Sequence, residues 1–278
     1  MTTIITEQRI KEFKESLYAE EKSKLTVDKY IRDIKAFLLY SNAQISRGAV
    51  LEYKERLINE YSVSSANSML AAINKFLKFC GLAELCVKQF KIQKKAFVSA
   101  DQELTREEYN RLVCTAERKN NERIALVIQT ICSTGIRVSE LSYITVEAAK
   151  SGEAVVSCKA KTRNIFIVSA LRKKLLRYAK ENNIKSGAIF ITKGGIPMNR
   201  SNVWREMKKL CRDAGVSDRK VFPHNLRHLF ARTFYGIDKD IAKLADILGH
   251  SSINTTRIYI ITTSEEHKKR MEHMHLIV

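Results

Sequence analysis

The stretch from Leu248 to Ile260, LGHSSINTTRIYI, contains two side chains that could carry out covalent chemistry. His250 follows a glycine, and Tyr259 comes nine residues later. A phenol with an ordinary pKa of about 10 is ionised to only about one part in a thousand at neutral pH, so a tyrosine nucleophile needs other groups to take its proton and to stabilise charge. Tyr259 could equally be a half-buried aromatic residue between two isoleucines. The chemical interpretation therefore depends on partners elsewhere in the chain.

Two other motifs offer such partners. TGIRVSEL places Arg137 at the start of a new helical turn, where backbone N–H groups already favour an anion. FPHNLRH begins a helix with proline and places His224 and Arg227 three residues apart on one face, where they could hold a phosphate oxygen between them. Each motif alone also fits a structural role, since Arg137 could pair with Glu140 and the His224 face could simply be solvated.

Positive charge is the strongest feature of the composition. The 278 residues include 49 Lys and Arg against 30 Asp and Glu, a net charge of +19. Charge of this size is usually maintained where a polyanion neutralises it, so nucleic acid is the expected partner. An acidic membrane surface fits less well, because no single basic amphipathic helix collects the cations. A soluble basic protein without a polyanionic partner is the remaining alternative.

Neither the apolar runs nor the cysteines indicate a membrane, secretory or metal-binding protein. The chain has no run of about 18 consecutive apolar residues, and its N-terminus lacks the apolar block of a secretory signal. The 6 cysteines are scattered, without a CxxC pair or a histidine at zinc-ligand spacing. We expect a cytoplasmic protein with reduced thiols and no metal site.

Apolar residues recur at helical spacing in four segments before Gly81, for example at Ile10, Phe13 and Leu17. They predict a small helical domain over residues 1–85. Residues 86–102 break this period and carry four lysines with one acidic residue, which predicts a basic linker, with an ordinary surface loop as the alternative.

Helical patterns resume at Thr105 and are interrupted by one β-rich region. Residues 154–158 and 164–168 are predicted to form a hairpin, and residues 188–192 a further short strand before a Gly-Gly turn. The predicted fold class is mainly α with a small β-sheet, or α+β.

In order along the chain, TGIRVSEL, a hairpin lysine, HNLRH, LGH and a tyrosine nine residues later resemble the tyrosine recombinase (phage integrase) family. The resemblance covers about Thr105 to Tyr259, and the four N-terminal helices resemble the core-binding domain of that family. It implies a SAM-like core-binding domain at 1–85, a linker at 86–102 and a catalytic domain at 103–278, which together form a C-shaped clamp on double-stranded DNA.

The resemblance also implies catalytic roles. Tyr259 would attack a phosphodiester and form a 3′-phosphotyrosyl ester, while Arg137 and Arg227 would stabilise the charge that grows on the non-bridging oxygens. His224 would act as general base toward Tyr259, and His250 would hydrogen-bond the phosphate. No metal or other cofactor is expected, because the candidate site is rich in Arg, His and Lys and has few acids to hold divalent ions. No ATP is expected, because one phosphoester is exchanged for another of similar energy.

A lysine would complete this set as the general acid for the leaving 5′-oxygen. The family places it in the hairpin turn, often within Gly-Lys-Gly, where this chain has CKAKT instead. Counting back from the second strand without gaps favours Lys159, with Lys161 as the alternative, two residues along on the same side of the strand. Glu140 matches an acidic position of the family motif and is expected to orient Arg137.

Assembly follows from the same resemblance. Family members act as four protomers on two duplexes, so we expect a tetramer assembled on two DNA sites, with room for accessory proteins. The C-terminal tip, Leu276-Ile277-Val278, is expected to dock on a neighbouring protomer. Two alternatives remain: a type IB topoisomerase that uses much the same residues, and a non-enzymatic DNA-binding regulator in which Tyr259 is structural.

Overall fold

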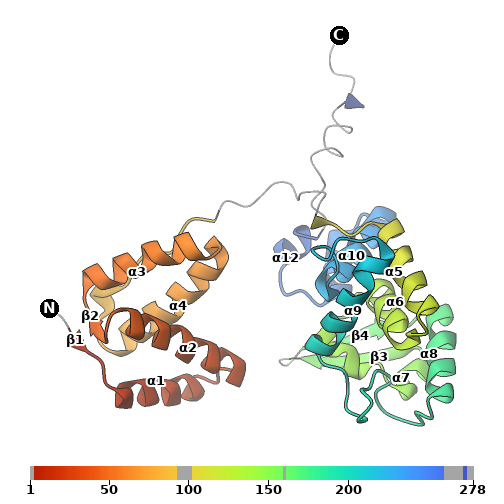
Figure 1. Ribbon diagram of the computed structural model, residues 1–278, viewed down its shortest axis with the longest axis horizontal. Helices are drawn as coiled ribbons and strands as arrows, with labels where there is room; N and C mark the ends of the chain where they lie inside the picture. The colour runs from red at the N-terminus through yellow and green to blue at the C-terminus, as the bar shows by residue number, and fades with distance from the viewer. Residues whose placement is uncertain (1–2, 93–101, 159–160, 260–271, 274–278) are drawn as a thin grey trace. The chain divides into compact units, whose positions relative to one another are not determined.

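The computed structural model describes residues 3–92, 102–158, 161–259 and 272–273 (Figure 1). The chain divides into two compact units, Met1–Lys94 and Lys95–Val278. Each unit has a hydrophobic core of its own, and helices make up most of both. The mainly helical fold with a small β component that the sequence predicts is confirmed.

The first unit is a four-helix domain. Its helices are α1 (Glu7–Ala19), α2 (Lys24–Tyr40), α3 (Arg47–Glu60) and α4 (Val63–Phe79), with the short strands β1 (Thr3–Ile4) and β2 (Gln44–Ile45) paired antiparallel and the 3-10 helix η1 (Ala83–Leu85) after α4. A Ser or Thr side chain caps the first turn of all four α-helices. Their apolar faces meet in one core, where Phe13, Phe37 and Phe76 are at most 1% exposed.

Residues 86–92, predicted to begin the linker, instead pack on the first unit. Asn74 donates from Nδ2 to the carbonyl of Val87 (2.8 Å) and accepts from the Val87 N–H (3.0 Å). Asn67 makes the same pair of bonds with Phe90, at 2.9 Å and 2.8 Å. An amide side chain offers a donor and an acceptor to extended backbone, so this segment is held without a helical pattern of its own. Residues 93–101 of the predicted linker lie outside the described residues.

Helix α6 (Glu122–Thr134) is the central element of the second unit. It packs against α5 (Arg106–Arg118), α8 (Ser169–Glu181), α9 (Arg200–Ala214) and α10 (Pro223–Asp238). The sequence of α6 is apolar nearly all round, and the buried helix that this predicts is confirmed. The helix ends at Gly135, whose φ of 65° is left-handed, and Arg137 then caps the 3-10 helix η3 (Val138–Tyr143).

The predicted hairpin is present, with different bounds for its second strand. After α7 (Val146–Ser151), strands β3 (Glu153–Cys158) and β4 (Lys161–Phe166) pair antiparallel, with Cys158 opposite Lys161. The second strand therefore begins earlier than the predicted 164–168. It also ends earlier, because Val168 serves as the N-cap of α8.

The predicted strand at 188–192 is wrong. Ala188 and Ile191 form only isolated bridges, to Thr145 and Pro197. The chain turns back at once, since the N–H of Thr192 donates to the carbonyl of Ile196 (2.8 Å), which leaves no length for a ladder. The apolar pattern here reflects burial of the segment rather than strand pairing.

The second unit continues through α11 (Ile241–Leu248) and α12 (Ile253–Arg257) to Tyr259. The predicted docking tip at Leu276-Ile277-Val278 lies outside the described residues. Within the described part of the chain, no helix is both long and apolar enough to cross a membrane.

Candidate active site

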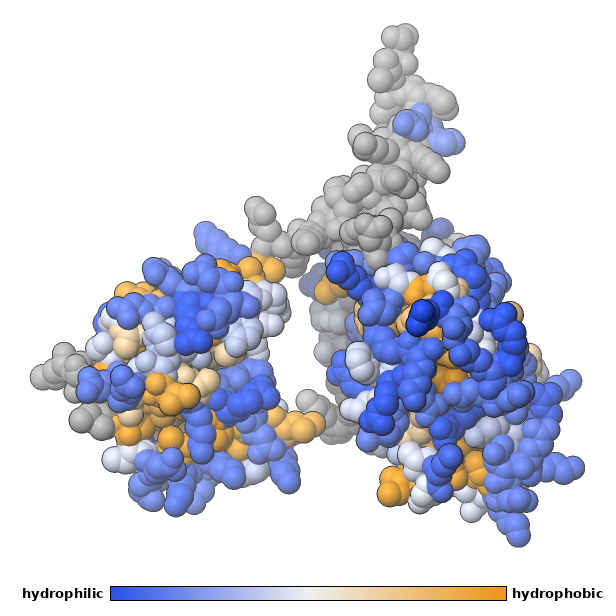
Figure 2. All heavy atoms as spheres, in the orientation of Figure 1, coloured by the Kyte–Doolittle hydropathy of each residue, from blue (hydrophilic) through white to orange (hydrophobic). Residues whose placement is uncertain are grey.

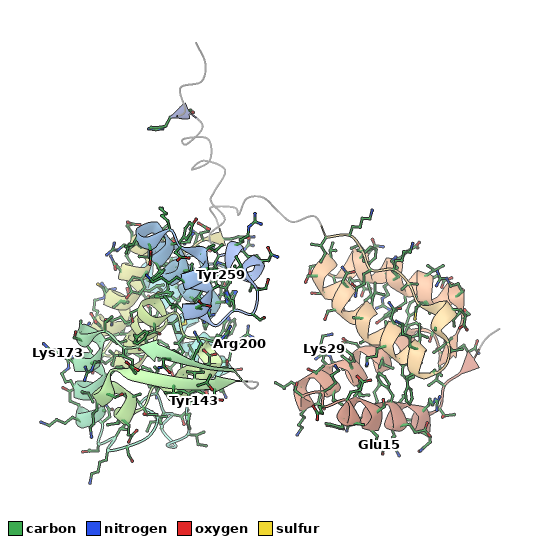
Figure 3. The ribbon with its side chains drawn as sticks, turned by 180° about the vertical axis from the view of Figure 1, so that it is seen from behind. Glu15, Lys29, Tyr143, Lys173, Arg200 and Tyr259 are labelled. Atoms are coloured by element: carbon green, nitrogen blue, oxygen red, sulfur yellow. The ribbon has the colours of Figure 1, made fainter. Side chains whose placement is uncertain are left out.

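Tyr259 lies in a turn just after α12, among the C-terminal helices of the second unit (Figure 3). It is 6% exposed and packs with Ala231, Leu244 and Leu248. The ring is thus more deeply buried than the half-buried aromatic residue that the sequence analysis kept as an alternative. Its hydroxyl lies 3.3 Å from Nε2 of His224, the second residue of α10. A phenol and an imidazole at this distance can exchange a proton.

A second imidazole, which the sequence analysis did not single out, packs on the tyrosine. The ring of His228 stacks on Tyr259 with 4.1 Å between centroids and 15° between planes. His228 follows His224 by one helical turn, and their rings meet edge to face at 4.8 Å. The HNLRH motif contains this signal, since residues four apart share a helix face.

Both imidazoles have lowered pKa values. Partial burial, followed by the positive charges of Arg227, Arg200 and Arg137, lowers the pKa of His224 below its ordinary 6.5. Burial is also the main cause for His228, whose pKa falls to about 4. Both rings are therefore neutral at physiological pH, and His224 can accept a proton.

Arg227 is the largest fully buried side chain of the described residues, at 1% exposure. Its Nη1 donates to the carbonyl of Gly135, and its Nη2 to the carbonyl of Leu248 (2.6 Å) and toward Nε2 of His250 (3.0 Å). Its Nε is buried and has no hydrogen-bond partner among the residues that the structure describes. Burial, and then the like charge of Arg137, lowers its pKa to about 10, so the guanidinium remains charged at neutral pH.

His250 is held from two sides. Because a guanidinium cannot accept a hydrogen bond, Nε2 of His250 accepts from Arg227, and Nδ1 then carries the proton of the neutral ring. That proton faces the hydroxyl of Thr256, 2.9 Å away and fully buried in α12. Burial and the surrounding arginines lower the pKa of His250 to about 4.

Arg137 is oriented by Glu140, as the sequence analysis expected. Glu140 accepts from the backbone N–H of Arg137 (2.9 Å) and from its Nη1 (2.9 Å). Glu140 is only 4% exposed, and burial acts to raise its pKa. The N–H of Arg137 and the charges of Arg163 and Arg137 outweigh burial, so the pKa of Glu140 lies below its ordinary value.

The C-terminal end of α11 brings three arginines together. Arg163, Arg227 and Arg137 donate to the successive carbonyls of residues 247, 248 and 249, at 2.6, 2.6 and 3.1 Å. The two carbonyls before these already accept from the N–H groups of residues 249 and 250. A helix C-terminus leaves its last carbonyls unpaired and partly negative, which suits guanidinium groups. The structure thus brings Arg137, Arg227, His224, His250 and Tyr259 to one place.

The lysine is the one predicted site residue that is not among them. Lys159 lies outside the described residues, between β3 and β4. Lys161 is the first residue of β4 and pairs with Cys158. Lys161 is thus a strand residue, and the expectation that Lys159 lies on the same side of that strand concerns a residue outside the described part of the chain.

Arg163 and Thr256 were also missed by the sequence analysis. Arg163 contacts residues that are distant in the sequence, and Thr256 acts through a hydroxyl within a helix. Neither feature can be predicted from the spacing of residues. The site as a whole is rich in cations, with Glu140 as its buried acid. Among the described residues, no group of three or more His, Cys, Asp or Glu side chains is arranged to hold a metal ion.

Known protein families match both units of the chain. Residues 102–266 match the phage integrase family, and residues 10–82 match the phage integrase N-terminal SAM-like domain. The chain is 29% identical to the tyrosine recombinase XerA of Pyrococcus furiosus over 277 residues, covering 96% of this chain and 94% of the relative. It is 25% identical to the tyrosine recombinase XerD of Halalkalibacterium halodurans over 275 residues, covering 90% and 91%.

Solved structures share the fold. A lambda integrase dimer bound to a COC′ core site matches with a TM-score of 0.72 and 19% identity, covering 94% of this chain and 95% of that one. The site-specific recombinase XerH bound to its difH substrate, in a pre-cleavage complex, matches with a TM-score of 0.69 and 18% identity, covering 95% and 84%. The family match spans more than half of the chain. The chain therefore belongs to the phage integrase family and is a tyrosine recombinase, an enzyme of site-specific DNA recombination.

Proposed function

We propose that this recombinase cleaves and rejoins double-stranded DNA through a phosphotyrosyl ester on Tyr259. The observation that carries the proposal is the hydroxyl of Tyr259, 3.3 Å from a neutral imidazole and beside the buried guanidinium of Arg227. The oxygen of Tyr259 attacks the phosphorus while its proton passes to Nε2 of His224. The bond from phosphorus to the 5′-oxygen breaks, and a lysine gives that oxygen a proton. The reverse sequence, with a new 5′-hydroxyl, reseals the strand.

Arg137 and Arg227 bind the non-bridging oxygens of the phosphate in this proposal. Arg227 is fixed by backbone carbonyls, so it stabilises the charge of the transition state without reorganising, and its buried Nε still has a hydrogen to donate. Arg137 is partly exposed, with a side chain 39% accessible, and so can reach a substrate.

His250 donates to the phosphate through Nε2. It now accepts there from Arg227, so the proton must move to Nε2 when a phosphate takes the place of that contact. The hydroxyl of Thr256 can donate or accept, and it can therefore partner Nδ1 in either tautomer. For the general acid we keep Lys159 first and Lys161 second. General acid assistance is worth about 10²–10⁴-fold, so loss of the correct lysine should slow cleavage without weakening DNA binding.

DNA is the proposed partner of both units, with residues 1–85 as the core-binding domain and residues 103–278 as the catalytic domain. The net charge of +19 supports this, as do the relatives solved in complex with DNA. Hydrophilic residues cover most of the visible face of the second unit (Figure 2). We further propose a tetramer on two DNA sites, in which the C-terminal tip docks on a neighbouring protomer. The relatives named above are recombinases and integrases, so a topoisomerase and a non-enzymatic regulator are not favoured.

A nicked suicide substrate tests the chemistry. The nick lets the short 5′-hydroxyl strand diffuse away after attack, so the wild-type protein should accumulate a covalent protein–DNA adduct on denaturing gels. Tyr259→Phe should bind the same DNA and form no adduct. An adduct at wild-type yield with Tyr259→Phe would exclude this nucleophile, and its absence with the wild-type protein on cognate DNA would exclude the reaction.

A further inference from the structure

Arg163 belongs to none of the motifs that define the site, yet it contacts two of the elements that build it. Its Nη2 donates to Oε2 of Glu140 (2.5 Å), and its Nη1 donates to the carbonyl of Ile247 at the end of α11 (2.6 Å). The aliphatic part of the side chain packs against Gly249, where an added Cβ would lie 2.6 Å from Cδ of Arg163. The side chain of Arg163 is only 12% exposed.

These contacts connect the surroundings of Arg137 and Arg227, the two arginines proposed to bind the phosphate, which are called the phosphate clamp below. Glu140 uses the same oxygen, Oε2, to accept from Arg163 and from the backbone N–H of Arg137. The carbonyl that accepts from Arg163 directly precedes the one that accepts from Arg227. Arg163 also lies on β4, two residues after Lys161, so it ties the lysine-bearing hairpin to the same point.

We propose that Arg163 is a positioning residue that sets the geometry of the phosphate clamp by holding Glu140, and through it Arg137, at the C-terminal end of α11. This inference rests on the proposed function and adds a group that does not itself touch the substrate. The planar guanidinium donates in two directions at once from a fixed fork. A lysine at the same place keeps the charge but has a single ammonium and cannot reproduce both bonds.

The decisive variant is therefore Arg163→Lys, compared with Arg163→Gln. The assay is single-turnover adduct formation on the nicked substrate, with DNA affinity measured in parallel. Misplacing reacting groups by about 1 Å can slow a reaction by about a hundredfold, so we expect both variants to cleave about ten to a hundred times more slowly. DNA affinity should stay within about threefold of wild type, because phosphate contacts along the duplex dominate it. Arg163→Lys at the wild-type rate, with Arg163→Gln impaired, would mean that only the charge matters and would overturn the proposal.

Arg123 provides a matched control in the same unit. It too bridges a carbonyl and a carboxylate, donating to Ile191 (2.8 Å) and to Glu206 (2.6 Å), at a place that contributes nothing to the site. Arg123→Lys should lose a similar amount of stability and keep the wild-type cleavage rate. Equal slowing by Arg123→Lys and Arg163→Lys would reduce the role of Arg163 to general stability.

A double-mutant cycle with Glu140→Gln tests whether Arg163 affects the cleavage rate through Glu140. If Arg163 acts through Glu140, adding Arg163→Lys to Glu140→Gln should slow cleavage by no more than about threefold further, since residues in one network are not additive. Full multiplication of the two losses would contradict the proposal. The wild-type reaction is scored separately: no adduct from the wild-type protein would reject the proposed function, whereas a wild-type adduct with unaffected Arg163 variants would reject this inference alone.

Discussion

His224 is the titratable side chain that contacts the hydroxyl of Tyr259, and its protonation state decides whether it can take the phenolic proton. Partial burial and three nearby arginines lower its pKa below the ordinary histidine value of 6.5, which favours the neutral ring at neutral pH. In the proposed mechanism, the arginines that bind the phosphate thus also disfavour a proton on His224. A base with a lowered pKa is a weaker base, but its neutral form, which can accept the proton, is favoured at neutral pH.

This predicts the pH dependence of cleavage. The second-order rate constant for adduct formation reports the free enzyme, so it should stay constant as pH falls through 6.5 and drop only below that value, when His224 gains a proton. This rate constant is measured on the nicked substrate at a series of pH values, with the DNA concentration kept below its dissociation constant. His224→Ala should remove the acid limb along with most of the activity. A limb centred at or above 6.5 would contradict this role for His224.

How far the sequence predicts the site differs from residue to residue. Sequence motifs identified five of the residues that the structure brings together: Arg137, Glu140, His224, Arg227 and Tyr259. Arg163 lies 23 residues from its carboxylate partner and 84 from its carbonyl partner, so only the folded chain pairs them. The carbonyl acceptors at the end of α11 have no sequence signature, because every residue has a backbone carbonyl.

At the level of elements, the helices and the presence of the hairpin were predictable from the sequence, whereas the bounds of the second hairpin strand and the conformation of residues 188–192 were not. Helical periodicity and caps are local, and they identified α1–α4 and the buried α6. The end of β4 depends instead on where α8 begins. The conformation of residues 188–192 depends on the turn that follows them. The junction between α6 and η3 shows a further constraint, because Gly135 there accepts a hydrogen bond from Arg227 while its Cα faces the ring of Phe230.

Gly135→Ala should therefore destabilise the protein more than the backbone conformation alone requires. A Cβ at Gly135 would lie 2.5 Å from Cδ1 of Phe230, in addition to the left-handed φ of 65°. Gly215, with a φ of 59° and nothing within 4 Å, is the matched control. We expect Gly215→Ala to cost about 1–2 kcal/mol and Gly135→Ala about 1–3 kcal/mol more, measured by urea unfolding. Equal losses in the free energy of unfolding would show that the contact with Phe230 relaxes freely.

At the level of the whole molecule, charge governs how the protein meets DNA. A net charge of +19 on 278 residues raises the concentration of phosphate around the protein before any specific contact forms. Backbone contacts of this kind release counterions and carry little sequence information. Sequence preference must then come from contacts to base edges or from the shape of the DNA.

DNA affinity should accordingly depend steeply on salt. A protein that neutralises about six to ten phosphates loses about 10³–10⁵ in affinity between about 50 and 200 mM salt. Titrations by fluorescence anisotropy on cognate and unrelated duplexes should give similar steep slopes, with the cognate curve displaced to tighter binding. A nearly flat dependence for both duplexes would exclude wrapping of the DNA backbone by a basic surface.

At the end of α11 the three arginines contact main-chain oxygens and no side chain of that helix, and this affects how the helix can vary. A substitution at the partly exposed Ile247 leaves its backbone acceptor in place, whereas Leu248 is also held by its packing against Tyr259. Inserting or deleting a single residue within α11 would rotate its end by about 100° and disengage all three guanidinium groups together. Changes in the amino-acid sequence of this helix can therefore preserve the three contacts, whereas a change in its length would disrupt the whole site.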